Sequence, residues 1–211
     1  MPPPTAKVLI ATSNAGKLRD FAGAAAPLGV VIEALPGFHL LPEVVEDGLT
    51  FEANARKKAV EYSRHAPGQI VLADDSGLEV DALNGAPGVH SARYAALESH
   101  SSPPGNSPDV ENNARLLREL ADFAPARKTA RFVCVLAAAR SGAVLEVFRG
   151  TVEGLILPAA RGAHGFGYDP LFFHPGLNKT LAEVSAEEKA LVSHRGAAFR
   201  DFLQWHRGQS Q

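Results

Sequence analysis

Two neighbouring carboxylates, Asp74 and Asp75, stand directly after an apolar run at positions 69–73 and before Ser76 and Gly77. The apolar run predicts a buried strand. The pair is therefore expected at the carboxyl end of that strand, where ligand sites of open α/β sheets gather. Two adjacent carboxylates repel each other unless they bind a cation, share a proton or pair with a base. This makes the pair a candidate for metal binding or acid–base chemistry. The alternative is a turn in which Asp and Ser cap backbone groups.

An acidic loop at positions 36–49 could supply a further carboxylate to the same place. It contains Glu43, Glu46 and Asp47. Magnesium prefers oxygen ligands of this kind and often keeps waters and substrate phosphates around it. The sequence therefore allows a magnesium site that joins the aspartate pair to one residue of this loop.

A second candidate site is the segment 12–17, with the sequence TSNAGK, between a predicted strand and the start of a predicted helix. The free N–H groups and the dipole of a helix N-terminus favour an anion. Gly16 lets the backbone approach a ligand closely, and Lys17 adds a positive charge. The segment is not a P-loop, because Leu18 follows the lysine where a P-loop has Ser or Thr. The alternative is an ordinary capped helix start.

Two weaker candidates lie further along the chain. Residues 165–170, with the sequence GFGYDP, combine glycines that leave room for a flat ligand with aromatic rings and an aspartate that could accept a hydrogen bond from a purine or pyrimidine base. An ordinary turn is the alternative there. Lys189 and the segment 193–195 offer cations to phosphates or carbonyl groups. Their alternative is a solvated helix face.

The elements that must position these residues alternate between strand and helix, which indicates an α/β fold. Capping residue types at 12–14, at Thr50 and at Ser107 and a capping box at 185–188 predict helix starts. A helix break is expected at 193–196. Strands are predicted at 8–11, 30–35 and 69–73, with a short strand at 78–82 and a hairpin of 129–139 with 143–157. A loop is predicted at 162–175.

Composition and charge exclude several classes of protein. The net charge of -2 excludes a strongly basic protein that binds nucleic acid by charge alone. The single cysteine, Cys134, excludes a disulfide scaffold and indicates a reducing compartment. No apolar run approaches the ~20 residues of a membrane-spanning helix. We therefore expect a cytoplasmic protein without membrane or nucleic-acid partners, with residues 1–6 as a disordered tail and 7–207 as one domain of two lobes.

Taken together and in order, these segments resemble the inosine triphosphate pyrophosphatase family. That family hydrolyses non-canonical purine nucleoside triphosphates. The ordered set is far more specific than any one segment and covers nearly the whole chain. The matching stretches are ATSNAGKL at 11–18, TF at 50–51 with NA at 54–55, ADDSGL at 73–78, GAPG at 85–88 with SARY at 91–94, GFGYDP at 165–170, and EK at 188–189 with SHRG at 193–196.

The resemblance implies a fold, a reaction and a cofactor. The fold would be α/β, with a central mixed β-sheet, flanking helices and two lobes around a nucleotide-binding cleft. The enzyme would be a magnesium-dependent homodimer that converts ITP, dITP or XTP to the nucleoside monophosphate and pyrophosphate. The alternatives are a pyrimidine nucleoside triphosphate pyrophosphatase of related architecture and a nucleotide-sensing module without turnover.

The resemblance also implies roles for individual residues. Asp75 would be the catalytic carboxylate and a metal ligand, with Glu46 as the second ligand and Glu43 in reserve. The chain departs from the family at Ala53, where an acidic residue is common, and this leaves the second ligand open. The expected substrate-binding residues are Thr12, Ser13, Asn14, Ala15, Gly16 and Lys17 for the triphosphate, Ser76 beside the catalytic carboxylate, and Phe166, Gly167, Tyr168, Asp169, Lys189, His194 and Arg195 for the base.

Overall fold

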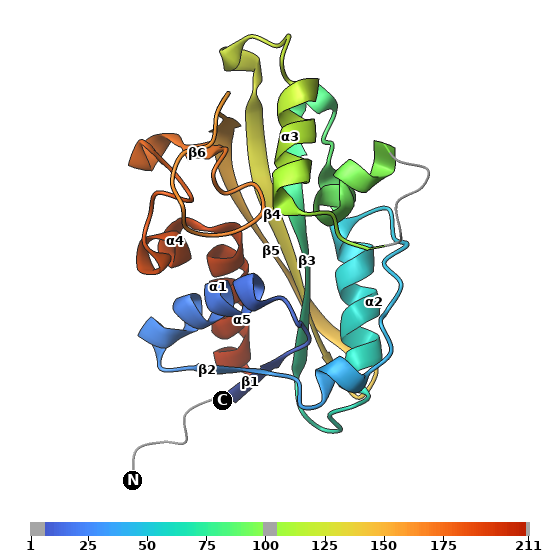
Figure 1. Cartoon of the computed structure of the whole chain (residues 1–211). Coiled ribbons are helices and arrows are strands. Elements are labelled where there is room, and N and C mark those ends of the chain that lie inside the picture. Colours follow the sequence, from blue (N-terminus) through green and yellow to red (C-terminus); the bar gives the residue numbers. More distant parts are fainter. Residues whose placement is uncertain (1–6, 99–104, 210–211) are drawn as a thin grey trace. The chain divides into compact units, whose positions relative to one another are not determined.

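The computed structural model describes residues 7–98 and 105–209, and the predicted tail at 1–6 lies outside them (Figure 1). The chain divides into two compact units. The first unit comprises Met1–Asp75, Cys134–Thr151 and Ala186–Gln211, and the second comprises Ser76–Val133 and Val152–Ser185. The expected cleft between two lobes and the domain limits 7–207 stay predictions.

Seven strands form one mixed sheet in the order β2-β1-β3-β4-β5-β6-β7. β1 pairs in parallel with β2 and β3, whereas β6 pairs antiparallel with β5 and β7. This confirms the predicted α/β fold with a mixed sheet. The strands are β1 Lys7–Ile10, β2 Val31–Ala34, β3 Val71–Val80, β4 Thr129–Arg140, β5 Ala143–Ile156, β6 Phe172–His174 and β7 Lys179–Thr180.

Among the described residues, four helices belong to the first unit and α3 to the second. Their bounds are α1 Ala15–Ala25, α2 Phe51–Ser63, α3 Asp109–Glu119, α4 Ala186–Val192 and α5 His194–Gly208. Within the first unit, α1 contacts β2, α4 and α5 (Figure 1). Among the described residues, none of the helices combines the length and the apolar character that crossing a membrane requires.

Local capping explains where several helices begin. The side chains of Asn14, Thr50 and Ser193 accept hydrogen bonds from backbone N–H groups three residues ahead, in α1, α2 and α5. Each bond satisfies an N–H group that the helix itself leaves unpaired. The predicted starts and the break before α5 are confirmed. The predicted cap of α3 was wrong, because Pro108 is the N-cap and the Ser107 hydroxyl instead accepts from the N–H of Ala96 at 3.1 Å.

β3 is longer than the sequence predicted. The sequence predicted a strand that ends at residue 73 and a second short strand at 78–82, but β3 runs without a break from Val71 to Val80. Asp74 and Asp75 therefore lie inside a strand rather than beyond its end, and the turn alternative is wrong. Successive side chains of a strand point to opposite faces, so each carboxylate can find its own partners without ending the strand.

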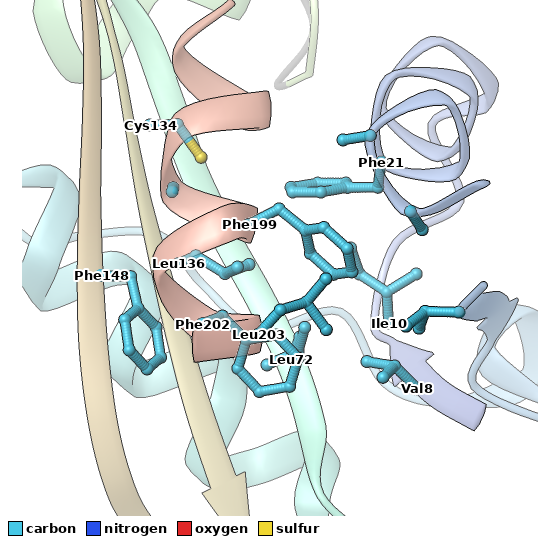
Figure 2. Packing of buried hydrophobic residues seen from close by; sticks show 14 of the residues in the cluster. Val8, Ile10, Phe21, Leu72, Cys134, Leu136, Phe148, Phe199, Phe202 and Leu203 are labelled. Carbon is cyan, nitrogen blue, oxygen red and sulfur yellow. The ribbon is translucent and has the colours of Figure 1, made fainter. Parts of the chain in front are cut away.

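The core of the first unit is built from α5, α1 and the sheet. Phe199, Phe202 and Leu203 of α5 pack in one cluster with Ile10 and Leu72 of β1 and β3 (Figure 2). Phe21 of α1 meets Phe199 edge to face, with ring centroids 6.0 Å apart. This packing supports the start of α1 and the middle of β3, which carry the candidate site.

The second unit has its own core. The rings of Phe132 and Phe172 lie 4.6 Å apart between centroids, and Leu116 and Leu120 on and next to α3 are fully buried. Phe172 belongs to β6, so the predicted loop at 162–175 was wrong from residue 172 onward. The apolar residues Phe172 and Phe173 form a strand instead of a loop because they pair with β5.

Candidate active site

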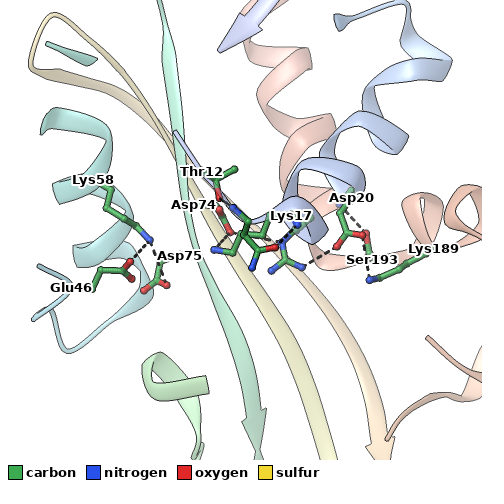
Figure 3. Close-up of polar contacts among 12 residues, drawn as sticks. Thr12, Lys17, Asp20, Glu46, Lys58, Asp74, Asp75, Lys189 and Ser193 are labelled. Atoms are coloured by element: carbon green, nitrogen blue, oxygen red, sulfur yellow. Dashed lines mark hydrogen bonds and ion pairs between the residues drawn. The ribbon is translucent and has the colours of Figure 1, made fainter. Parts of the chain in front are cut away.

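The two adjacent aspartates of β3 have separate sets of partners (Figure 3). Asp74 Oδ2 lies 2.9 Å from Lys17 Nζ and 3.8 Å from Arg195 Nε. Asp75 Oδ2 accepts a hydrogen bond from Asn54 Nδ2 at 2.9 Å, and its Oδ1 lies 3.9 Å from Lys58 Nζ. The alternation of the strand thus turns one sequence pair into two different electrostatic environments.

Asp74 is a buried carboxylate that neighbouring cations keep ionised. Burial alone would raise its pKa, but the charges of Lys17, Arg195 and Lys58 outweigh burial and lower the pKa to about 2. An ionised Asp74 in turn orients the Lys17 ammonium group. Asp74 is therefore suited to holding cations in place rather than to exchanging protons near neutral pH.

Asp75 has the opposite shift. Burial raises its pKa, Lys58 lowers it and Glu46 raises it again, and the net result is a pKa above the ordinary value. Environments that push the pKa values of two neighbouring carboxyl groups apart are typical of acid–base sites. Of the two aspartates, Asp75 is the one suited to accepting a proton.

Lys58 joins Asp75 to the acidic loop. Its Nζ lies 3.0 Å from Glu46 Oε1, and the side chain is almost fully buried. Burial alone would lower the pKa of Lys58, but the charges of Asp75, Asp74 and Glu46 raise it. Lys58 therefore remains an ammonium ion and offsets part of the repulsion between the carboxylates of Asp75 and Glu46.

Lys58 is buried, although lysine side chains are usually exposed. Asn54 and Lys58 are four residues apart on α2, which puts them on one face of the helix. Both side chains reach Asp75. The i, i+4 spacing of Asn54 and Lys58 was the sequence signal that could have indicated a shared polar contact.

The structure also separates the acidic residues of the loop. Glu46 meets Lys58, whereas Asp47 pairs with the exposed Lys57 at 2.7 Å. Glu43 is exposed. Glu46 is therefore the loop carboxylate that the structure brings toward Asp75.

The segment 12–17 forms a compact start to α1. Thr12 Oγ1 accepts from the N–H of Asn14 at 3.2 Å, and Asn14 Oδ1 accepts from the N–H of Lys17 at 3.0 Å. Gly16 is buried, while residues 13–15 are exposed. The capped helix start is observed, and the exposed residues at a helix N-terminus also leave the predicted anion site its physical basis.

Lys189 and Arg195 share one carboxylate, that of Asp20 on α1. Lys189 Nζ lies 3.3 Å from Asp20 Oδ1, and Arg195 Nη1 donates to Asp20 Oδ2 at 3.1 Å. Both cationic side chains are buried, so the alternative of a solvated helix face was wrong. Asp20 was not predicted from the sequence, because its partners lie about 170 residues further along the chain.

His194 is buried next to these cations. Burial lowers the pKa of its imidazole well below the ordinary value, and the charges of Arg195, Lys189 and Lys17 lower it further. The ring is therefore neutral near pH 7. A neutral ring presents one donor and one acceptor.

Four of the predicted base-reading residues, 166–169, form an ordered turn in the second unit. Asp169 Oδ2 accepts from the N–H of Phe166 at 2.9 Å, and the Tyr168 hydroxyl donates to the carbonyl of Ser91 at 2.9 Å. Gly165 has a φ of +75°, and a Cβ there would lie 2.1 Å from Asp169 Oδ2. The turn alternative is thus observed as local geometry, and contact with a base stays a prediction. Ser76 also belongs to the second unit.

The donor chemistry of Glu46 and Asp75 fits magnesium. Both offer carboxylate oxygens, and the charge of Glu46 raises the pKa of Asp75, which means that the two groups repel. A divalent cation would relieve that repulsion. Within the described part of the chain, no group of three or more His, Cys, Asp or Glu side chains is arranged to hold a metal ion. Two carboxylates leave ligand positions for water and phosphate oxygens, as magnesium sites commonly do.

Comparisons with known proteins find relatives along nearly the whole chain. A sequence model described as the Ham1 family matches residues 8–205. A dITP/XTP pyrophosphatase of Exiguobacterium sibiricum is 49% identical over 195 residues, which cover 92% of this chain and 93% of the relative. A dITP/XTP pyrophosphatase of Geobacillus kaustophilus is 47% identical over 192 residues, or 91% of this chain and 90% of the relative.

Solved structures give the same result for the fold. The Ham1 protein of Staphylococcus aureus superposes with a TM-score of 0.79 at 37% identity, covering 96% of this chain and 99% of that one. The dITP/XTP pyrophosphatase of Mycobacterium abscessus superposes with a TM-score of 0.69 at 40% identity, covering 93% of this chain and 98% of that one.

Proposed function

This chain belongs to the Ham1 family, and from that premise we propose that it hydrolyses dITP, ITP and XTP to the nucleoside monophosphate and pyrophosphate. The relatives named dITP/XTP pyrophosphatase support this substrate class. The observation that carries the proposal is that two adjacent aspartates have different partners and opposite pKa shifts. Asp74 is held ionised beside Lys17, and Asp75 has a raised pKa beside Lys58 and Glu46.

In this proposal, Asp75 accepts the proton of a water molecule that attacks the α-phosphorus. Lys17 places its charge against the phosphates, and Asp74 fixes the direction of that lysine. The exposed N–H groups at the start of α1 hold phosphate oxygens. Magnesium held by Glu46 and Asp75 would supply positive charge to the triphosphate.

The base is read by hydrogen bonds. Inosine and xanthosine carry a 6-carbonyl acceptor and an N1–H donor, whereas adenine carries a 6-amino donor and an N1 acceptor. We assign recognition of the first pattern to Lys189, His194 and Arg195, together with the turn at 166–169. A donor that faces another donor in a buried site costs about 1–3 kcal/mol, so such a site can reject adenine by ~10²-fold or more.

The test is a panel of nucleoside triphosphates with separate detection of pyrophosphate and phosphate. We expect pyrophosphate and monophosphate as products, with kcat/KM for ITP, dITP and XTP well above GTP and lowest for ATP and CTP. Release of free phosphate would place the attack at the γ-phosphorus and contradict the mechanism. Preference for CTP would favour the pyrimidine enzyme, and binding without turnover would favour the sensing module.

A second arm of the test links the activity to the described site. Asp75→Asn keeps the shape of the side chain and removes its basicity, so kcat should fall by at least ~10²-fold with unchanged circular dichroism. Asp47→Asn is the matched control, because Asp47 is exposed and pairs with Lys57. Equal turnover in the two variants would contradict the role of Asp75. Magnesium dependence is checked by titration of the metal, and the homodimer by light scattering.

A further inference from the structure

We propose that Asp109 and Asn113 of α3 are positioning residues for base recognition, which they support by holding both backbone polar groups of Gly167. Asp109 Oδ2 accepts from the N–H of Gly167 at 2.6 Å, and Asn113 Nδ2 donates to the carbonyl of Gly167 at 3.0 Å. Gly167 is the centre of the turn to which the proposed function assigns base recognition. The inference rests on that assignment and adds the residues that set the geometry of the turn.

The two side chains act together because of their spacing. Asp109 and Asn113 are four residues apart, so they lie on the same face of α3. One carries an acceptor and the other a donor, which matches the donor and the acceptor of a single peptide residue. A carboxylate that accepts from a backbone N–H forms one of the stronger hydrogen bonds in proteins. The pair thus fixes both the position and the direction of the Gly167 backbone.

α3 is a firm support for this contact because other residues of the helix are anchored to neighbouring segments. Leu116 is fully buried. Asn112 Oδ1 accepts from the N–H of Ala95 at 2.8 Å, and Arg115 Nη1 donates to the carbonyl of Tyr94. The Arg115 guanidinium also stacks over the ring of Tyr94, 4.0 Å from its centroid. A shift of the Asp109 face would require these contacts to break.

The turn transmits the position of Gly167 to its neighbours. The side chain of Asp169 is bonded to the N–H of Phe166, and the hydroxyl of Tyr168 is bonded to Ser91. Gly167 has a φ of +62°, a conformation that non-glycine residues rarely adopt. Phe166 and Asp169 are therefore placed by a short, closed set of bonds whose external anchor on α3 is the pair Asp109 and Asn113.

If Asp109 only stabilised the helix, removal of either acidic residue of the first turn would have the same effect. Acidic residues in the first turn of a helix stabilise the helix through its dipole, and both Asp109 and Glu111 stand there. Glu111 is exposed. Glu111→Ala removes the same charge from the same turn and serves as the matched control, while Asp109→Asn restores a hydrogen-bond acceptor.

The experiment compares kcat/KM on dITP and dATP in these variants. For Asp109→Ala and Asn113→Asp, we expect the ratio of dITP to dATP efficiency to fall about tenfold, mainly through the KM for dITP. Glu111→Ala should keep the wild-type ratio, and Asp109→Asn should recover most of it. An unchanged ratio in Asp109→Ala, or an equal loss on both substrates, would overturn the proposal.

Hydrogen exchange measures the positioning without turnover. The N–H of Gly167 should exchange slowly in the wild type and in Glu111→Ala, and at least tenfold faster in Asp109→Ala. Fast exchange in the wild type would overturn the positioning even if dITP were preferred. A wild type with slow exchange but no preference for dITP would contradict the proposed function, and the specificity role would fall with it.

Discussion

At the scale of residues, the site depends on charges that compensate one another at short range. Lys58 lies against Glu46 and Asp75 in a nearly water-free position. The neighbouring Lys57 makes a shorter ion pair with Asp47, at 2.7 Å against 3.0 Å between Lys58 and Glu46, but at the surface. Two adjacent lysines of one helix therefore offer a direct comparison of a buried and an exposed ion pair.

Replacing each lysine by methionine should separate the two cases. Lys58→Met leaves the buried Asp75 and the partly exposed Glu46 without their cation, and we expect the free energy of unfolding to fall by about 3 kcal/mol or more. Turnover should fall at least ~10-fold, because the pKa of Asp75 loses its main lowering influence. Lys57→Met should change the free energy of unfolding by under about 1 kcal/mol. Urea unfolding and steady-state kinetics provide the measurements.

The comparison has a clear negative outcome. Equal losses of stability in the two variants would mean that the Lys58 pair behaves as a surface pair. Full activity in Lys58→Met would remove Lys58 from the site altogether.

At the scale of elements, Asp20 connects three helices of the first unit. It lies on α1 and meets Lys189 of α4 (Figure 3) and Arg195 of α5. α1 begins at the predicted phosphate-binding segment, and α4 and α5 carry the predicted base-reading cations. One carboxylate thus coordinates the placement of side chains that come from distant parts of the chain.

Loss of this carboxylate should loosen both cations at once. Asp20→Asn keeps one acceptor oxygen but no charge, so Lys189 and Arg195 lose their shared partner, and we expect the KM for dITP to rise about tenfold with a smaller effect on kcat. Asp201→Asn is the control, because Asp201 is an exposed aspartate of α5. A KM for Asp20→Asn within twofold of the control would show that the connection does not hold the cations for substrate.

At the scale of the whole molecule, the buried cations make stability depend on pH. The pKa of His194 is well below its ordinary value because of burial and of Arg195, Lys189 and Lys17. The unfolded chain therefore takes up the proton of this histidine at a higher pH than the folded protein does. Stability from this source is complete above the unfolded pKa of about 6.5 and is lost as the pH falls below it.

The free energy of unfolding at two pH values tests this dependence on pH. Between pH 7.5 and 5.5, the neutral His194 should account for a loss of about 1.4 kcal/mol in the free energy of unfolding. His194→Gln should show a loss smaller by that amount, while His39→Gln, at an exposed position, should follow the wild type. Asp74, with a pKa of about 2, acts only at lower pH. Parallel pH profiles for wild type and His194→Gln would contradict a neutral, buried ring.

Much of this protein was readable from the sequence because the relevant signals are local. The helix starts near residue 14 and at Thr50 were predicted from capping residue types, and a cap bonds to a backbone N–H only three residues away. The start of α5 was expected as a break at 193–196. Apolar runs predicted β1, β2, the first part of β3 and the hairpin of β4 and β5, but not β6 and β7, and the ordered set of short segments identified the family. Each of these features depends on neighbours along the chain.

The tertiary structure decided what depends on distant partners. The sequence did not reveal that β3 continues through Asp74 and Asp75, that Lys58 turns inward, or that Asp20 holds two cations. A charged residue is expected at the surface or at the end of a strand, because burial of an isolated charge costs far more than a local sequence can repay. Only folding brings in the opposite charges that make burial possible, and their positions along the chain follow no local spacing.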